Sequence, residues 1–159
     1  MTVRNAGGRS VVVWAILCVL FPLGGHASQA VPVKVTPIQR GEMSGIEERR
    51  EAVVRTAAEW SALWKQHQPG QKPPAIDFTR FMAVGVFLGS RPSGGFSLEI
   101  TAVEREGADL VVTYRESKPD PKMMVTQMLT SPFHVVRIDR HAGPVRFRAA
   151  AAPAKSENK

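Results

Sequence analysis

FMAVGVFLGSRPSGGFSLEITAVE, residues 81–104, contains two hydrophobic patterns that each predict a β-strand. The first part, residues 81–89, is apolar throughout, which is typical of a central strand covered on both faces. In the last part, apolar side chains at every second position from Phe96 to Ala102 alternate with polar ones, as in a half-buried strand. The stretch therefore predicts two consecutive strands joined by the loop at residues 89–95.

One helix is indicated just before this stretch. Thr56 and Glu59 form a T-x-x-E capping box, in which the hydroxyl and the carboxylate satisfy backbone N–H groups at a helix start. Trp60 and Trp64 then share one face at helical spacing, and Pro69 and Gly70 follow the last turn near His67. We expect the two tryptophans to anchor this helix to a sheet.

Other segments show strand patterns. They lie at residues 108–116, 125–129 (VTQML), 134–139 and 145–148, with weaker patterns at 33–39 and 51–55. So many strands with short connections and one helix predict an α+β fold, with a mainly antiparallel β-sheet and one principal helix packed on a face.

The first thirty residues predict export. Arg4 and Arg9 precede an apolar run at residues 11–23, which would span about 20 Å as a helix and is too short for a bilayer core of about 30 Å. Ser28 and Ala30 suit a signal peptidase, and Gly25 and Ala27 offer a second possible cleavage site. We expect a signal peptide at 1–30, a domain at 31–148 and a disordered tail at 149–159. An uncleaved N-terminal anchor is the alternative. Cys18 follows Leu17 inside the apolar run, so no lipid anchor is expected.

Composition after cleavage bounds the function. Cys18 is the one cysteine of the chain, so the domain at 31–148 would contain no disulfide. Removing Arg4 and Arg9 leaves 19 basic and 14 acidic residues, a net charge of +5. This charge suits an acidic partner or an anionic envelope surface. We expect an extracytoplasmic protein, periplasmic or secreted, without a nucleic-acid partner.

No catalytic or metal-binding signature is present in the sequence. The histidines after the signal segment, His67, His134 and His141, lack the spacing of a zinc site, so we expect neither a metal nor a cofactor. His134 and Asp139 would lie about 16 Å apart on opposite faces of a strand, which excludes a triad with Ser131. The sequence therefore predicts a protein that is not an enzyme.

Two loops instead suggest a protein-binding surface, because arginine and aromatic residues are enriched where binding energy concentrates. The candidate residues are Arg91, Pro92, Ser93, Gly94, Gly95 and Phe96 in the first loop, and Ser131, Pro132, Phe133 and His134 in the second. Glycine and proline also serve in ordinary turns, so the alternative is that both loops only connect strands.

The order of several motifs resembles the PrcB C-terminal domain family. The motifs are SGI (44–46), EWSALW (59–64), IDF (76–78), VFLGSRPSGGFSLEI (86–100), VTQMLTSPFHVVRI (125–138) and GPVRF (143–147). The resemblance implies an exported, non-catalytic module that binds an extracytoplasmic protein such as a protease and stabilises it. A second resemblance is limited to SRPSGGF, which is similar to a loop of chagasin-like inhibitors and implies a protease inhibitor acting through the Arg91–Phe96 loop.

Overall fold

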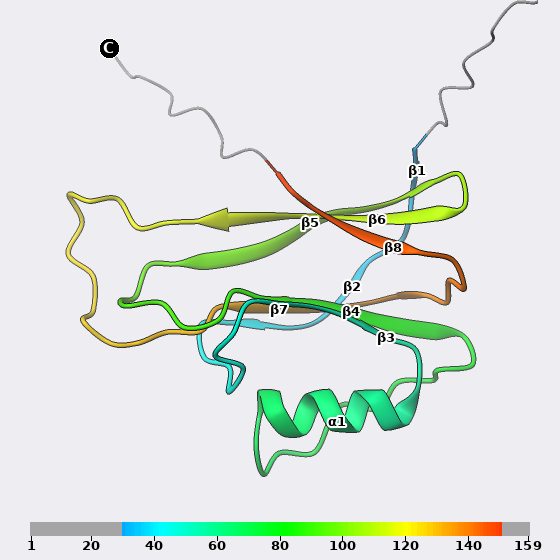
Figure 1. Ribbon diagram of the computed structural model, residues 1–159, viewed down its shortest axis with the longest axis horizontal. Coiled ribbons are helices and arrows are strands. Elements are labelled where there is room, and N and C mark those ends of the chain that lie inside the picture. Colours follow the sequence, from blue (N-terminus) through cyan, green and yellow to red (C-terminus); the bar gives the residue numbers. More distant parts are fainter. Residues whose placement is uncertain (1–29, 151–159) are drawn as a thin grey trace, which may run out of the picture.

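Two four-stranded sheets face each other, and a single helix covers the outer face of one of them, as Figure 1 shows. The computed structural model describes residues 30–150. The elements are β1 (Val31–Pro32), β2 (Thr36–Gly41), β3 (Arg50–Val54), α1 (Ala57–His67), β4 (Phe81–Phe87), β5 (Ser97–Glu106), β6 (Asp109–Ser117), β7 (Phe133–Asp139) and β8 (Val145–Ala149). The predicted signal peptide therefore lies outside the described residues, except for Ala30.

The first sheet has the strand order β1-β5-β6-β8 and the second has the order β2-β7-β4-β3. All neighbouring strands are antiparallel except β6 and β8, which are parallel. The predicted α+β class, with mainly antiparallel strands and one helix, is confirmed. The strands nevertheless form two sheets, because the chain crosses from the second sheet to the first between β4 and β5 and returns before β7.

The central strand β4 is buried on both faces, as its continuous apolar pattern predicted. Met82, Val84 and Val86 pack against the first sheet, in the core between the two sheets. Ala83 and Phe87 alternate with them and pack toward α1. Both faces of β4 are thus covered, one by a sheet and the other by a helix.

Strand β5 departs from the predicted alternation at a β-bulge. Leu98 and Ile100 point into the core between the sheets, but the next buried core residue is Val103 rather than Ala102. The pairing register with β6 shifts between Ile100 and Ala102, so the extra residue reverses which side chains point inward.

Helix α1 begins and ends where the sequence predicted. Thr56 is the N-cap: the Glu59 backbone N–H donates to Thr56 Oγ1 at 3.2 Å, and the Thr56 backbone N–H donates to Glu59 Oε2 at 3.1 Å. Trp60 and Trp64 are each 3 % exposed and pack on the second sheet, which confirms them as anchors. No helix within residues 30–150 is long and apolar enough to cross a membrane.

The predicted strand at residues 125–129 is wrong. These residues lie in the connection between β6 and β7, and Met128 and Leu129 are exposed. The β-branched and apolar residues of this segment favour a strand, but no strand pairs with it, and the isolated bridge between Arg91 and Thr130 lies just after it. At the C-terminus, β8 includes Ala149 and the Ala150 N–H donates to the Tyr114 carbonyl at 2.7 Å, so the ordered chain extends past the predicted boundary. The rest of the predicted tail lies outside the described residues.

Candidate protein-binding surface

Three connections gather at one end of the two sheets, on the left in Figure 1: residues 42–49, 88–96 and 118–132. Backbone hydrogen bonds join them. The Ser90 N–H donates to the Glu47 carbonyl at 2.8 Å, and the Ser131 N–H donates to the Glu42 carbonyl at 2.7 Å. The connection at 118–132, here called the β6–β7 loop, contains fifteen residues. Loops of this length without secondary structure are uncommon in compact domains and often functional.

The two loops singled out by the sequence lie side by side. Arg91 and Thr130 exchange backbone hydrogen bonds of 2.7 and 3.0 Å. The Thr130 hydroxyl donates to the Ser93 carbonyl at 2.8 Å, and the Gly94 N–H donates to the Thr126 carbonyl at 2.9 Å. The loop at 88–96 therefore acts as a support for the β6–β7 loop.

Gly94 and Gly95 are required for this contact. A Cβ at Gly94 would collide with the Thr126 hydroxyl, and a Cβ at Gly95 would lie 2.8 Å from the Pro119 Cβ. Gly95 also has a φ of 82°, which non-glycine residues rarely adopt. The two glycines thus permit a close backbone approach to the protein's own β6–β7 loop.

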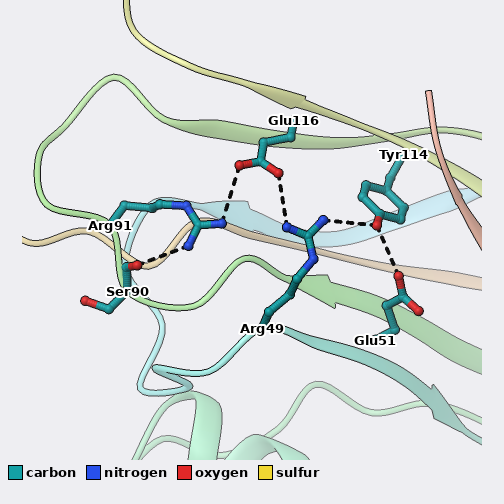
Figure 2. Close-up of polar contacts among 6 residues, drawn as sticks. All are labelled: Arg49, Glu51, Ser90, Arg91, Tyr114 and Glu116. Carbon is teal, nitrogen blue, oxygen red and sulfur yellow. Dashed lines mark hydrogen bonds and ion pairs between the residues drawn. The ribbon is translucent and has the colours of Figure 1, made fainter. Parts of the chain in front are cut away.

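A chain of polar contacts holds the same end of the molecule (Figure 2). Glu116 accepts from Arg91 at 3.4 Å and from Arg49 at 3.1 Å. Arg49 also donates to the Tyr114 hydroxyl at 3.1 Å, and this hydroxyl donates to Glu51 at 3.1 Å. Tyr114 and Glu116 belong to β6 of the first sheet, and Glu51 belongs to β3 of the second. These polar contacts therefore connect the two sheets. The charge of Arg91 is compensated within the protein.

The predicted site residues differ in accessibility. Pro92 and Gly95 are exposed, and Arg91, Ser93 and Phe96 are half-buried. The buried members of the predicted set are Gly94, Ser131, Pro132, Phe133 and His134. The first loop thus presents most of its residues to solvent, whereas the second runs into the core. A role of these ten residues in binding a partner stays a prediction.

Phe133 and His134 have structural partners inside the domain. The Phe133 ring lies 4.2 Å from the ring of His67 and stacks at 6.2 Å on Phe87, beneath α1. His134 points the other way, and its Nδ1 accepts a hydrogen bond of 2.8 Å from the Ile100 N–H of the first sheet. Burial lowers the pKa of His134, and the Arg40 charge lowers it further, while Glu99 acts in the opposite direction.

The largest exposed apolar side chains of this end lie on the β6–β7 loop. Met124 is fully exposed, and the exposed fractions are 67 % for Met123 and 66 % for Leu129. Met128 is exposed as well, and Met43 lies on the connection at 42–49. We call Met123, Met124, Met128 and Leu129 the methionine patch. The sequence analysis does not predict this patch, because it assigns residues 125–129 to a strand, although Pro119, Pro121 and Pro132 indicate a loop.

The described part of the chain contains no group of three or more His, Cys, Asp and Glu residues that could hold a metal ion. His134 is engaged with the Ile100 N–H, and Asp139 lies at the opposite end of β7. Exposed flexible apolar side chains such as those of the methionine patch are typical of protein-binding surfaces.

Comparison with known families agrees with the resemblance seen in the sequence. Residues 82–139 match the family model described as PrcB C-terminal. This region belongs to the PrcB C-terminal family. The PrcB C-terminal region extends from β4 to the end of β7, so it contains both predicted loops and the methionine patch. No curated protein and no solved structure matches the chain.

Proposed function

We propose that this protein is an exported, non-catalytic protein-binding module that associates with an extracytoplasmic protease and stabilises it. The PrcB C-terminal match supports a protease-complex-associated domain. The methionine patch is the observation that carries the proposal, because it consists of four exposed apolar side chains on one loop within the matched region.

The methionine patch is presented on a braced loop. Backbone hydrogen bonds join Thr126 to Gly94 and Thr130 to Arg91, one on each side of Met128. A loop that is held in place before binding loses less conformational entropy when a partner binds. The methionine side chains keep their own flexibility, which lets them adapt to the partner's surface.

The contacts of Arg91 indicate which interaction provides the affinity. Its guanidinium already pairs with Glu116 and donates to the Ser90 carbonyl at 3.1 Å. The Arg91 side chain therefore holds the loop in place within the protein. The favourable free energy of binding would come instead from removing the methionine patch from water. We expect binding to depend weakly on salt and strongly on the methionine patch.

Capture from envelope and culture extracts tests this function. Immobilised wild-type protein is compared with a triple variant, Met123→Gln, Met124→Gln and Met128→Gln, and with Val31→Thr. Val31 is an exposed apolar residue outside the methionine patch, so its variant is the matched control. We expect the wild type and Val31→Thr to retain the same protease, and the triple variant to retain at least tenfold less.

Stabilisation is then measured on the captured protease. Its activity should decay more slowly at raised temperature with wild-type protein than with the triple variant. Equal capture by the triple variant contradicts the proposed surface, and retention of proteins without any protease contradicts the proposed partner. A captured protease whose initial rate falls on addition of the domain indicates instead an inhibitor acting through residues 91–96.

Export is part of the proposal and rests on the sequence of residues 1–30. Sequencing the N-terminus of the accumulated protein tests it. A start at Ser28 or Val31 supports cleavage and an extracytoplasmic location. An intact Met1 or Thr2 contradicts cleavage.

A further inference from the structure

A second surface lies at the opposite end of the second sheet from the methionine patch. Phe81 pairs with Asp139 at one end of β4 and β7, whereas Phe87 pairs with Phe133 at the end that adjoins the loops described above. Next to Phe81 there is a pocket of about 230 Å³. Its lining residues are Lys34, Thr36, Arg80, Phe81, Arg137, Ile138 and Asp139. None of them belongs to the proposed protease-binding surface.

Adjacent strands bring these residues together. Thr36 of β2 is the register partner of Arg137 of β7, and β4 follows β7 on its other side. Residues alternate between faces along a strand, so Arg137 and Phe81 lie on the same face as Val135 and Ala83, which pack toward α1. The backbone of Arg80 is fixed by the Arg140 N–H, which donates to its carbonyl at 2.9 Å.

Two guanidinium groups share one aromatic ring in this pocket. The guanidinium carbon of Arg137 lies 4.4 Å from the centre of the Phe81 ring, and that of Arg80 lies 5.3 Å from it. Both distances are within the range of cation–π attraction, which positions the two cations next to the pocket. Lys34 adds a third cation and Thr36 a hydroxyl.

The cations of the pocket are only partly compensated by nearby carboxylates, because the Asp77 carboxylate that attracts Arg80 is exposed to solvent, which weakens the attraction. Within residues 30–150, neither Lys34, Arg80 nor Arg137 forms a salt bridge, and Asp139 is the one acidic residue among the pocket's lining residues. Three cations and one carboxylate leave a local charge of +2. The positive charges of Lys34, Arg80 and Arg137 repel one another. An anion bound among them would reduce this repulsion and would itself be attracted by each cation.

We infer that this pocket binds a doubly charged phosphate group. A phosphate monoester carries a charge of about −1.5 to −2 at neutral pH, which matches the pocket, whereas a single carboxylate compensates only half of it. Arginine is suited to phosphate because its planar group donates in pairs to two oxygens. Three cations also fit several phosphate oxygens at once.

An adjoining pocket has room for what the phosphate is attached to. It has a volume of about 340 Å³ and shares Lys34 and Asp139 with the first pocket. Its other lining residues are Val31, Pro32, Val33 and Arg105. The two pockets together would accommodate either free phosphate or a phosphomonoester headgroup with an organic substituent.

Calorimetric titration of the purified protein with inorganic phosphate at constant ionic strength tests the site. We expect saturable binding that Arg80→Gln and Arg137→Gln each weaken at least tenfold. Arg115→Gln is the matched control because it removes the same charge from an exposed position on β6. It should change the dissociation constant less than twofold. Circular dichroism and melting temperature in phosphate-free buffer show whether each variant is folded.

A charge-neutral variant makes the test independent of net charge. Phe81→Leu keeps every cation but removes the shared ring, and we expect it to weaken phosphate binding at least threefold. Equal weakening by Arg137→Gln and Arg115→Gln, or acetate binding as tightly as phosphate, overturns the inference. Binding should also weaken as the pH falls through the second pKa of phosphate, because the dianion then takes up a proton.

Flotation with phosphatidylcholine vesicles distinguishes the two sources of the phosphate. Vesicles that contain phosphatidic acid present a monoester, and those with phosphatidylglycerol present a singly charged diester. Retention by phosphatidic acid alone, lost in Arg137→Gln, assigns the site to a lipid headgroup. No retention by either vesicle, together with calorimetric binding, assigns it to a soluble phosphate compound. Absence of binding in both measurements overturns the proposal.

Discussion

Nδ1 of His134 on β7 accepts a hydrogen bond from the backbone N–H of Ile100 on β5, so a side chain of one sheet satisfies the backbone of the other. The N–H lies beside the bulge, on the edge of β5 that β1 covers only at Glu104 and Arg105. His134 is 6 % exposed, and water therefore cannot easily replace it. The hydrogen bond connects the two sheets next to the bulge, where the alternation of inward and outward side chains along β5 reverses.

Replacing His134 should show what this bond contributes. We expect His134→Ala to lower the free energy of unfolding by about 2–4 kcal/mol, because it leaves a buried N–H without a partner and opens a cavity. His134→Gln keeps a carbonyl acceptor and should recover about 1 kcal/mol of this loss. Urea denaturation of the three proteins measures the difference. Equal stability of the two variants would show that the acceptor is unimportant.

Stability should depend on pH between about 6.5 and 4. Burial lowers the pKa of His67 to about 4 and is also the main cause of the lowered pKa of His134. The unfolded chain, with ordinary pKa values near 6.5, therefore binds more protons than the folded one in this range. The contribution of the two neutral, buried histidines to the free energy of unfolding is therefore fully present above pH 6.5 and is lost as the pH falls toward 4.

His67→Leu provides the control for this pH dependence. It removes one of the two buried titrating groups, so the slope of unfolding free energy against pH between 6.5 and 4 should become shallower by the contribution of one proton. Denaturation curves at several pH values measure both slopes. An unchanged slope in His67→Leu would contradict the assignment to this residue.

Gly95 and Gly70 offer a matched pair for testing the contact between the loops. Both have a positive φ, 82° and 81°, but a Cβ at Gly70 meets nothing within 4 Å, whereas one at Gly95 meets Pro119. Alanine at either position costs about 1 kcal/mol for the backbone conformation. We expect Gly95→Ala to cost at least about 1 kcal/mol more and to increase proteolysis of the β6–β7 loop. Similar melting temperatures for the two variants would exclude tight packing at Gly95.

Glu116 should stabilise the domain through its two arginine partners. Its side chain is 22 % exposed and pairs with Arg49 and Arg91. Because the pairs are partly solvated, we expect Glu116→Gln to lower the unfolding free energy by only about 1 kcal/mol. The loss should shrink in 1 M salt, which screens the pairs. A loss that is independent of salt would indicate that packing, not charge, is responsible.

Local patterns predicted the elements well. The capping box of Thr56 and Glu59 located α1, and the continuous apolar run located β4, because both depend on neighbours in the sequence. The arrangement into two sheets and the parallel pairing of β8 with β6 depend on residues far apart in the chain. A pattern with period two carries no information about which strand will be the partner.

The candidate site was predicted only in part, because local patterns indicate its loops but not the contacts between residues far apart in the chain. The two loops were expected from their glycines and prolines, and they do lie together. The partners of Arg91 and Arg49 could not be predicted, since Arg49 and Glu116 are separated by 67 positions. Residues 125–129 were wrongly predicted as a strand because the β-branched and apolar side chains of Val125, Thr126 and Leu129 favour one, although no neighbouring strand pairs with them.

The central position of β4 also determines when the protein can fold. Its register partners in β7 follow between 46 and 58 residues later in the chain, from the Phe87–Phe133 pair to the Phe81–Asp139 pair. A chain that leaves a ribosome or a translocation pore N-terminus first thus carries β4 with only β3 beside it until β7 emerges. Such a strand exposes an apolar edge that invites aggregation. We therefore expect synthesis of this domain to depend on rapid completion of the chain or on a chaperone that shields residues 81–87 until β7 is available.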